Sequence, residues 1–179
     1  AAASFGVLFE SDNDLWITDG TAGGTQFLHS VNIGWEPGLE CGGRYFFEGE
    51  ADYSVGRELY ATDGTTGGTG LVADIRPESG VTNSSFPTEF VCLNNTVYFS
   101  AGDGTNGEEL WRSDGTSAGT SMVLDIFVGG EYESGNPEDP IAYSNALYFQ
   151  AGDSTGRGMW TSDGTEAGTV MVKDINPGS

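Results

Sequence analysis

The stretch Glu109-Leu110-Trp111-Arg112-Ser113-Asp114-Gly115-Thr116 decides the fold, because three other parts of the chain repeat it. The related stretches are Asp14-Leu15-Trp16-Ile17-Thr18-Asp19-Gly20-Thr21, Glu58-Leu59-Tyr60-Ala61-Thr62-Asp63-Gly64-Thr65 and Gly158-Met159-Trp160-Thr161-Ser162-Asp163-Gly164-Thr165. The Leu or Met position recurs after 44, 51 and 49 residues, a period typical of propeller blades. The chain is therefore predicted to be a single repeat domain with copies at approximately 1–36, 37–86, 87–139 and 140–179.

An Asp-Gly-Thr turn follows the apolar part of every motif, and a second Gly-Thr lies shortly after it. Glycine can adopt positive φ angles, and Asp and Thr side chains can bond nearby backbone N–H groups. The motif therefore predicts a tight hairpin turn rather than a catalytic group. The predicted turn residues are Asp19, Gly20, Thr21, Asp63, Gly64, Thr65, Asp114, Gly115, Thr116, Asp163, Gly164 and Thr165.

Strand-like segments surround each motif and predict four strands per copy. The apolar segments after the turns are 27–31, 71–75, 122–126 and 171–175. The segments before the motifs are 7–9, 45–47, 97–99 and 147–149. Shorter segments lie still earlier in three copies, at 39–41, 90–92 and 141–143. A sheet this small cannot bury both faces alone, so the copies must pack on one another. We therefore expect an all-β, four-bladed β-propeller of four-stranded antiparallel blades that closes into a ring.

The first strand of copy one falls on Ala1-Ala2-Ala3, which has poor β propensity and little side chain to bury. Either the ring closes loosely there, or a strand from a neighbouring molecule completes the sheet.

The charge of the chain limits its partners. There are 27 acidic and only 6 basic side chains, which gives a formal net charge of −21 and repels phosphate backbones. We therefore expect no nucleic-acid partner. No apolar run approaches the roughly 18 residues that span a bilayer, so membrane insertion is not expected either.

The motif of copy three resembles the defining signature of the ELWxxDGT repeat proteins, because Glu109 to Thr116 matches every fixed position. The other copies depart slightly: Asp14 replaces Glu, Tyr60 replaces Trp, and Gly158-Met159 replaces Glu-Leu. The resemblance implies a secreted or cell-surface protein, typically bacterial. It carries no catalytic residues to transfer.

Catalytic side chains are scarce. The one histidine, His29, lies in the apolar last strand of copy one, where a catalytic triad or a histidine metal site has no partners in the pattern. We therefore expect no enzymatic activity and assign no catalytic residues.

The cysteines Cys41 and Cys92 are predicted to hold the same place in consecutive copies. A disulfide is favoured in a secreted chain if the Cα atoms come within about 7 Å. Two buried free thiols are the alternative.

Acidic, glycine-rich loops join the second and third strands. Asp103, Asn106 and Glu108 are spaced to converge on calcium, which takes hard oxygen ligands. No EF-hand loop or nonapeptide calcium repeat is present, and a plain solvated turn is the alternative. No other cofactor is expected.

Two sequons, at Asn83 and Asn94, predict exposed glycosylation sites and hence a glycoprotein. The loop aromatics Trp35, Tyr53 and Tyr132 could stack on sugars or fold back as packing lids.

These features favour an extracellular structural or adhesive module that self-associates, as a homo-oligomer or surface fibre, through strand or loop contacts. A carbohydrate-binding, lectin-like propeller is the alternative. A propeller hydrolase, with the motif aspartates gathered at a central opening, is more remote.

Overall fold

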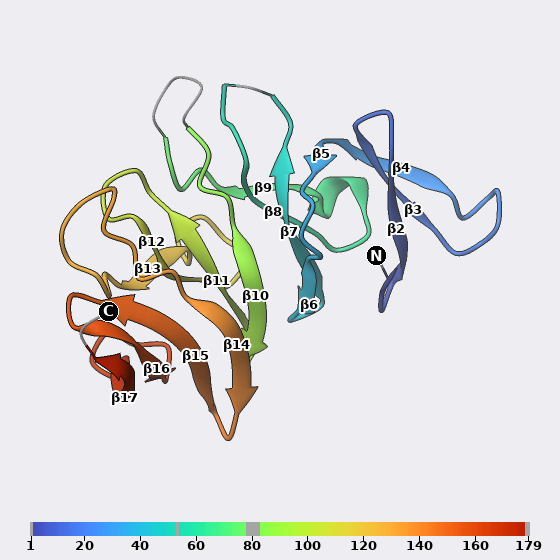
Figure 1. The fold of residues 1–179 in the computed structure, drawn as a ribbon. Coiled ribbons are helices and arrows are strands. Elements are labelled where there is room, and N and C mark those ends of the chain that lie inside the picture. The colour runs from blue at the N-terminus through green and yellow to red at the C-terminus, as the bar shows by residue number, and fades with distance from the viewer. Residues whose placement is uncertain (1, 53, 78–82, 178–179) are drawn as a thin grey trace.

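The computed structural model describes residues 2–52, 54–77 and 83–177, and these form four antiparallel sheets (Figure 1). Sheet 1 contains β1 (Ala2–Ala3), β2 (Gly6–Ser11), β3 (Asp14–Thr18) and β4 (Gln26–Ser30). Sheet 2 contains β5 (Asn32–Ile33), β6 (Leu39–Cys41), β7 (Arg44–Glu50), β8 (Glu58–Thr62) and β9 (Gly70–Ala73). Sheet 3 contains β10 (Thr88–Leu93), β11 (Thr96–Gly102), β12 (Glu108–Ser113) and β13 (Ser121–Leu124). Sheet 4 contains β14 (Glu138–Tyr143), β15 (Ala146–Asp153), β16 (Gly156–Ser162) and β17 (Val170–Pro177).

Each sheet is a simple meander in which strands that are consecutive in the chain pair with each other. Sheet 2 has five strands only because its first strand is interrupted. The short strands β5 and β6 both pair with β7, with Asn32 opposite Glu50 and Leu39 opposite Phe46. A 3-10 turn, η1 (Thr66–Gly68), lies between β8 and β9.

The predicted all-β class and the four blade-like antiparallel sheets are confirmed. The weak first strand of copy one is present as β1, where Ala2 lies opposite Val7. Sheets 1 and 4 lie at opposite ends of the molecule in Figure 1, so the structure does not show closure of the ring.

The hydrophobic core consists of three layers, one between each pair of consecutive sheets. Successive residues of a strand point to opposite faces of a sheet, so the neighbours Phe46 and Phe47 of β7 lie in different layers. Phe47 packs against Leu8 and other residues of sheet 1, whereas Phe46 packs with Phe99 of sheet 3. We call the face toward the preceding sheet the upstream face and the other the downstream face.

The second copy illustrates the hydrogen bonds of the motif turn. Asp63 Oδ1 accepts the backbone N–H and the hydroxyl of Thr65, at 2.9 and 2.7 Å. Thr65 Oγ1 in turn accepts the Gly68 N–H, and the Thr69 hydroxyl donates to the Thr65 carbonyl. Because that donation uses the one proton of Thr69, the Thr62 hydroxyl must donate in the 2.6 Å contact between the two threonines.

The same network occurs in the other three copies, with Ser113 or Ser162 replacing the first threonine in copies three and four. The glycine of each Asp-Gly-Thr has φ close to +90°, a region that other residues avoid. The predicted turn residues thus form one repeated structural turn.

Glycine is also required at the start of the second Gly-Thr. A Cβ atom on Gly68 would lie 2.0 Å from Asp63 Oδ1, whereas a Cβ on the adjacent Gly67 would meet nothing within 4 Å. We expect Gly68→Ala to lower the free energy of unfolding by about 2 kcal/mol, in the range of overpacking substitutions. Gly67→Ala is the matched control and should leave it almost unchanged.

Urea denaturation of the two variants checks this expectation. Equal midpoints for Gly68→Ala and Gly67→Ala would show that the turn tolerates a side chain facing the Asp carboxylate.

Candidate functional site

Among the described residues, no other sheet covers the upstream face of sheet 1. Val7 and Phe9 of β2 are 49% and 36% exposed, whereas their counterparts in β11, Val97 and Phe99, are completely buried. Phe9 stacks on Trp16, with ring centroids 6.5 Å apart. This face therefore presents an apolar surface at the positions that sheets 2, 3 and 4 bury.

The downstream face of sheet 4 is exposed in the same way. Tyr148 of β15 is 37% exposed, and Val172 and Ile175 of β17 are 57% and 62% exposed. The counterparts of these three residues in the other sheets are all buried: Leu8, Phe46 and Tyr98; Leu28, Val72 and Val123; Val31, Ile75 and Ile126. The described part of the chain thus leaves two sheet faces uncovered, one on sheet 1 and one on sheet 4.

At the rim of each layer the motif turn contacts the preceding sheet, through a different side chain in each case. Arg44 Nη1 of sheet 2 donates to the motif carbonyl of Gly115 in sheet 3 at 2.6 Å, and Arg112 Nη1 of sheet 3 donates to Gly164 in sheet 4 at 2.9 Å. The motif glycine of sheet 2, Gly64, lies against Phe5 of sheet 1. Each motif turn of sheets 2 to 4 therefore contacts the sheet that precedes it.

The motif glutamates Glu58 and Glu109 are buried and connect consecutive sheets. Glu109 accepts the N–H of Ile126, at the end of its own sheet, and of Gly135, in the segment that leads to sheet 4, at 2.9 and 2.7 Å. Glu58 accepts from Ile75 at 2.8 Å and from Ser85 in the segment that leads to sheet 3. Sequence reasoning missed this role, although the motif glutamate itself was visible.

Burial raises the pKa of both carboxyls to about 7, while the hydrogen bonds from the residues that they hold act in the opposite direction. In the motif turns the pKa of the carboxyl is shifted in the opposite direction, below its usual value. The Thr side-chain hydrogen bond, together with the Thr backbone N–H, lowers the pKa of Asp19, Asp63, Asp114 and Asp163.

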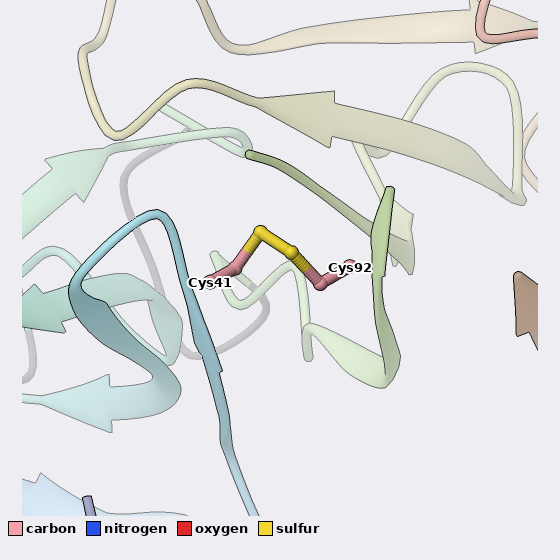
Figure 2. Close-up of a disulfide and its surroundings, with 2 residues drawn as sticks. All are labelled: Cys41 and Cys92. Atoms are coloured by element: carbon pink, nitrogen blue, oxygen red, sulfur yellow. A yellow bond between two sulfur atoms is a disulfide. The ribbon is translucent and has the colours of Figure 1, made fainter. Parts of the chain in front are cut away.

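The cysteines Cys41 and Cys92 form a disulfide between β6 of sheet 2 and β10 of sheet 3, with Cα atoms 5.5 Å apart (Figure 2). Their expected equivalence is wrong by one residue. Cys41 lies opposite Arg44, one position before Tyr45, whereas Cys92 lies opposite Val97, the counterpart of Tyr45. This offset places Cys41 on a downstream face and Cys92 on an upstream face, so that the two side chains meet.

The residues proposed for calcium are only partly brought together. Asp103 and Asn106 form a local turn, in which Asp103 Oδ1 accepts the backbone N–H groups of Thr105 and Asn106, and Oδ2 accepts Asn106 Nδ2, each at 2.8 Å. Glu108 belongs to β12, where its N–H donates to Ser134 Oγ. Across the described residues, no group of three His, Cys, Asp or Glu side chains is placed to hold a metal ion.

The two sequons differ in exposure. Asn94 is exposed and its Nδ2 donates to Asn145 Oδ1 at 2.6 Å. Asn83 was expected to be exposed but is buried, and its Nδ2 donates to the Ser54 carbonyl at 2.8 Å. Glycosylation at either position stays a prediction.

An apolar pocket of about 290 Å³ lies between sheets 1 and 2, lined by residues that include Leu8, Tyr45, Phe47 and Trp35. Trp35 is 96% exposed and Tyr132 is 90% exposed, whereas Tyr53 lies outside the described residues. His29 packs beside Tyr60, with ring centroids 6.4 Å apart.

Comparisons with known proteins bear on the fold. No sequence family matches the chain and no curated protein matches it, so the ELWxxDGT resemblance stays a prediction. A puromycin hydrolase structure is similar over 92% of this chain and 25% of its own, with 14% identity and a TM-score of 0.53. An acylaminoacyl peptidase from Pyrococcus horikoshii is similar over 91% of this chain and 23% of its own, with 16% identity and a TM-score of 0.48.

The chain thus spans about a quarter of the length of the puromycin hydrolase. At this identity the likeness concerns the fold alone, and it supports a fold of the β-propeller type. In the described part of the chain, no helix is long and apolar enough to cross a membrane.

The raised pKa values of Glu58 and Glu109 predict a pH dependence of stability. A carboxyl whose folded pKa lies above its unfolded value stabilises the fold fully below the unfolded value, and this contribution is lost as the pH rises through about 7. Between pH 6 and pH 8 we expect a loss of roughly 1 kcal/mol per carboxyl.

Urea denaturation at a series of pH values measures this loss. The double variant Glu58→Gln/Glu109→Gln should be less stable and should lack this slope, whereas Glu108→Gln, at an exposed neighbouring position, should retain it. A slope that persists in the double variant would assign the effect to other groups.

Proposed function

We propose that the chain is an extracellular structural module that associates with itself through its two uncovered end faces. The observation that carries the proposal is that Val7, Phe9, Tyr148, Val172 and Ile175 are exposed at positions that are buried in every internal layer. Exposed apolar patches rimmed by polar residues are typical of interaction surfaces. The Cys41–Cys92 disulfide supports an oxidising, extracellular location.

The net charge of −21 sets the conditions of this association. Like charges on two copies repel each other over distances that salt screens. Assembly through apolar faces is therefore expected to strengthen as the salt concentration rises.

Self-association is tested by sedimentation velocity over a concentration series in moderate salt. The wild-type chain should form oligomers, and Ile175→Glu should reduce their apparent association constant at least tenfold, because it places a charge in the apolar contact. Val128→Glu is the control, since Val128 is 78% exposed but lies in a turn outside the end faces. Monomers at all concentrations would overturn the proposal.

Glycan binding is the second candidate, and the exposed Trp35 beside the apolar pocket favours it. An indole ring next to a concave surface is suited to stacking on a sugar ring. Because Trp35 and the lining residue Pro37 lie in an interruption between β5 and β6, this site would be single rather than repeated in every copy. Hydrolysis has less support, since the motif aspartates are bound within their own turns.

A glycan array followed by titration calorimetry tests the second candidate. A ligand that uses the pocket should lose at least tenfold in affinity with Trp35→Ala, because the stacking surface is removed. Tyr132→Ala removes an equally exposed aromatic ring elsewhere and should have no effect. An array without saturable binding would count against this candidate.

A further inference from the structure

The three internal layers of the structure are repeats of one interface. In each layer, the downstream face of one sheet contributes an apolar residue from its second strand, one or two from its third strand, and others from its fourth strand and the residues just after it. The upstream face of the next sheet contributes the alternate residues of its second strand. Phe46 and Phe99, for example, meet in the layer between sheets 2 and 3 in the way that Tyr98 and Phe149 share the next one.

The uncovered end faces are the two halves of this same interface. Sheet 4 carries Tyr148, Val172 and Ile175 at the downstream positions, and sheet 1 carries Val7 and Phe9 at the upstream positions. One copy of the chain therefore supplies one unpaired downstream face and one unpaired upstream face.

The motif glycines support this pairing. Gly64, Gly115 and Gly164 each lie against a residue of the preceding sheet: Phe5, Arg44 and Tyr98 respectively. A Cβ atom on Gly20, the motif glycine of sheet 1, would meet nothing within 4 Å. Gly20 is thus the one motif glycine without the contact that a preceding sheet provides.

We infer that the downstream face of sheet 4 packs on the upstream face of sheet 1 of a second copy of this chain, as sheet 2 packs on sheet 3. The inference rests on the proposed self-association and names its partner and contact. Within one molecule the two faces lie at opposite ends and do not cover each other (Figure 1), whereas a second copy carries the half of the interface that each face lacks. Such a head-to-tail contact generates an open chain or a larger ring.

The disulfide between sheets 2 and 3 defines the register of this contact. Tyr143 lies opposite Ala146 in sheet 4 as Cys41 lies opposite Arg44 in sheet 2. Ala2 lies opposite Val7 in sheet 1 as Cys92 lies opposite Val97 in sheet 3. If the contact repeats the internal interface, position 143 of one copy faces position 2 of the next at a separation that a disulfide can bridge.

Paired cysteine substitutions test the inference directly. The variant Tyr143→Cys/Ala2→Cys should give a ladder of covalent oligomers on non-reducing gels after mild oxidation, and reductant should remove it. Both positions are exposed, so these changes spare the core. The matched control is Tyr143→Cys/Ala3→Cys, because Ala3 packs on the opposite face of sheet 1; it should cross-link at least tenfold less.

A mixing experiment separates contacts between copies from closure within one chain. Chains with Tyr143→Cys alone and chains with Ala2→Cys alone should form mixed disulfide dimers when combined, with a 2–143 cross-link identified by mass spectrometry. A monomeric product of the double variant with an internal 2–143 cross-link would show a closed ring and overturn the inference.

Sedimentation and cross-linking together distinguish failure of the face-to-face contact from failure of self-association. If sedimentation shows oligomers of the wild-type chain but the double variant cross-links no more than its control, self-association stands and the face-to-face contact is wrong. If sedimentation shows only monomers and no cross-link forms, both are wrong.

Discussion

Every sheet of this chain has two apolar faces, and a sheet of four short strands cannot cover either of them by itself. The fold depends on this constraint, because burial of apolar surface is the main favourable term in folding. Adjacent residues such as Phe46 and Phe47 belong to different layers, so each internal sheet contributes to two layers at once. A sheet removed from the stack would expose both faces, and for this reason the stability of one copy is inseparable from that of its neighbours.

Polar side chains stabilise the motif turns and the connections that hold the apolar faces against one another. The motif turns hold ionised Asp carboxylates with lowered pKa values at the exposed hairpins, and this contribution is lost as the pH falls through those values. The buried Glu58 and Glu109 hold the connections between sheets, and their contribution is lost in the opposite direction, as the pH rises. The two kinds of carboxyl thus limit stability from the acid and the alkaline side respectively.

Local pattern was sufficient to predict the four antiparallel sheets and their motif turns from the sequence, since the motif fixes where each sheet begins its third strand. The uncovered faces could not be predicted in the same way, because the sequence does not show which alternate residues of a strand face another sheet. Val172 and Val123 look the same in the sequence, but only Val123 is covered by another sheet of the described residues. The one-residue offset of the cysteines was hidden for a related reason: it becomes visible only when Cys41 and Cys92 are aligned by strand pairing rather than by distance from the motif. Asn83 is buried in a place where its side chain meets Ser54, 29 residues away in the sequence, and no local pattern encodes such a contact.

The residue at the first motif position differs with the path that the chain takes beside it. In sheets 2 and 3 the glutamate accepts the N–H of Ile75 or Ile126 as the chain leaves the sheet. In sheet 4 the residue at this position is Gly158, and a Cβ atom there would lie 2.7 Å from the Lys173 carbonyl. The strand β17 can therefore continue along β16 as far as Pro177.

In sheet 1 the motif residue is Asp14, which is one methylene shorter than glutamate. The segment that leaves this sheet is instead bound by Glu10, which accepts the Ile33 N–H at 3.1 Å. Sheet 4 thus lacks the carboxylate that connects an internal sheet to its successor. The contact that we propose between sheet 4 and a second copy is therefore expected to rest on apolar burial, since Ala146 and Thr161 of sheet 4 replace the rim arginines Arg44 and Arg112. We expect such a contact to be reversible and to respond to salt, because two strongly acidic chains repel each other.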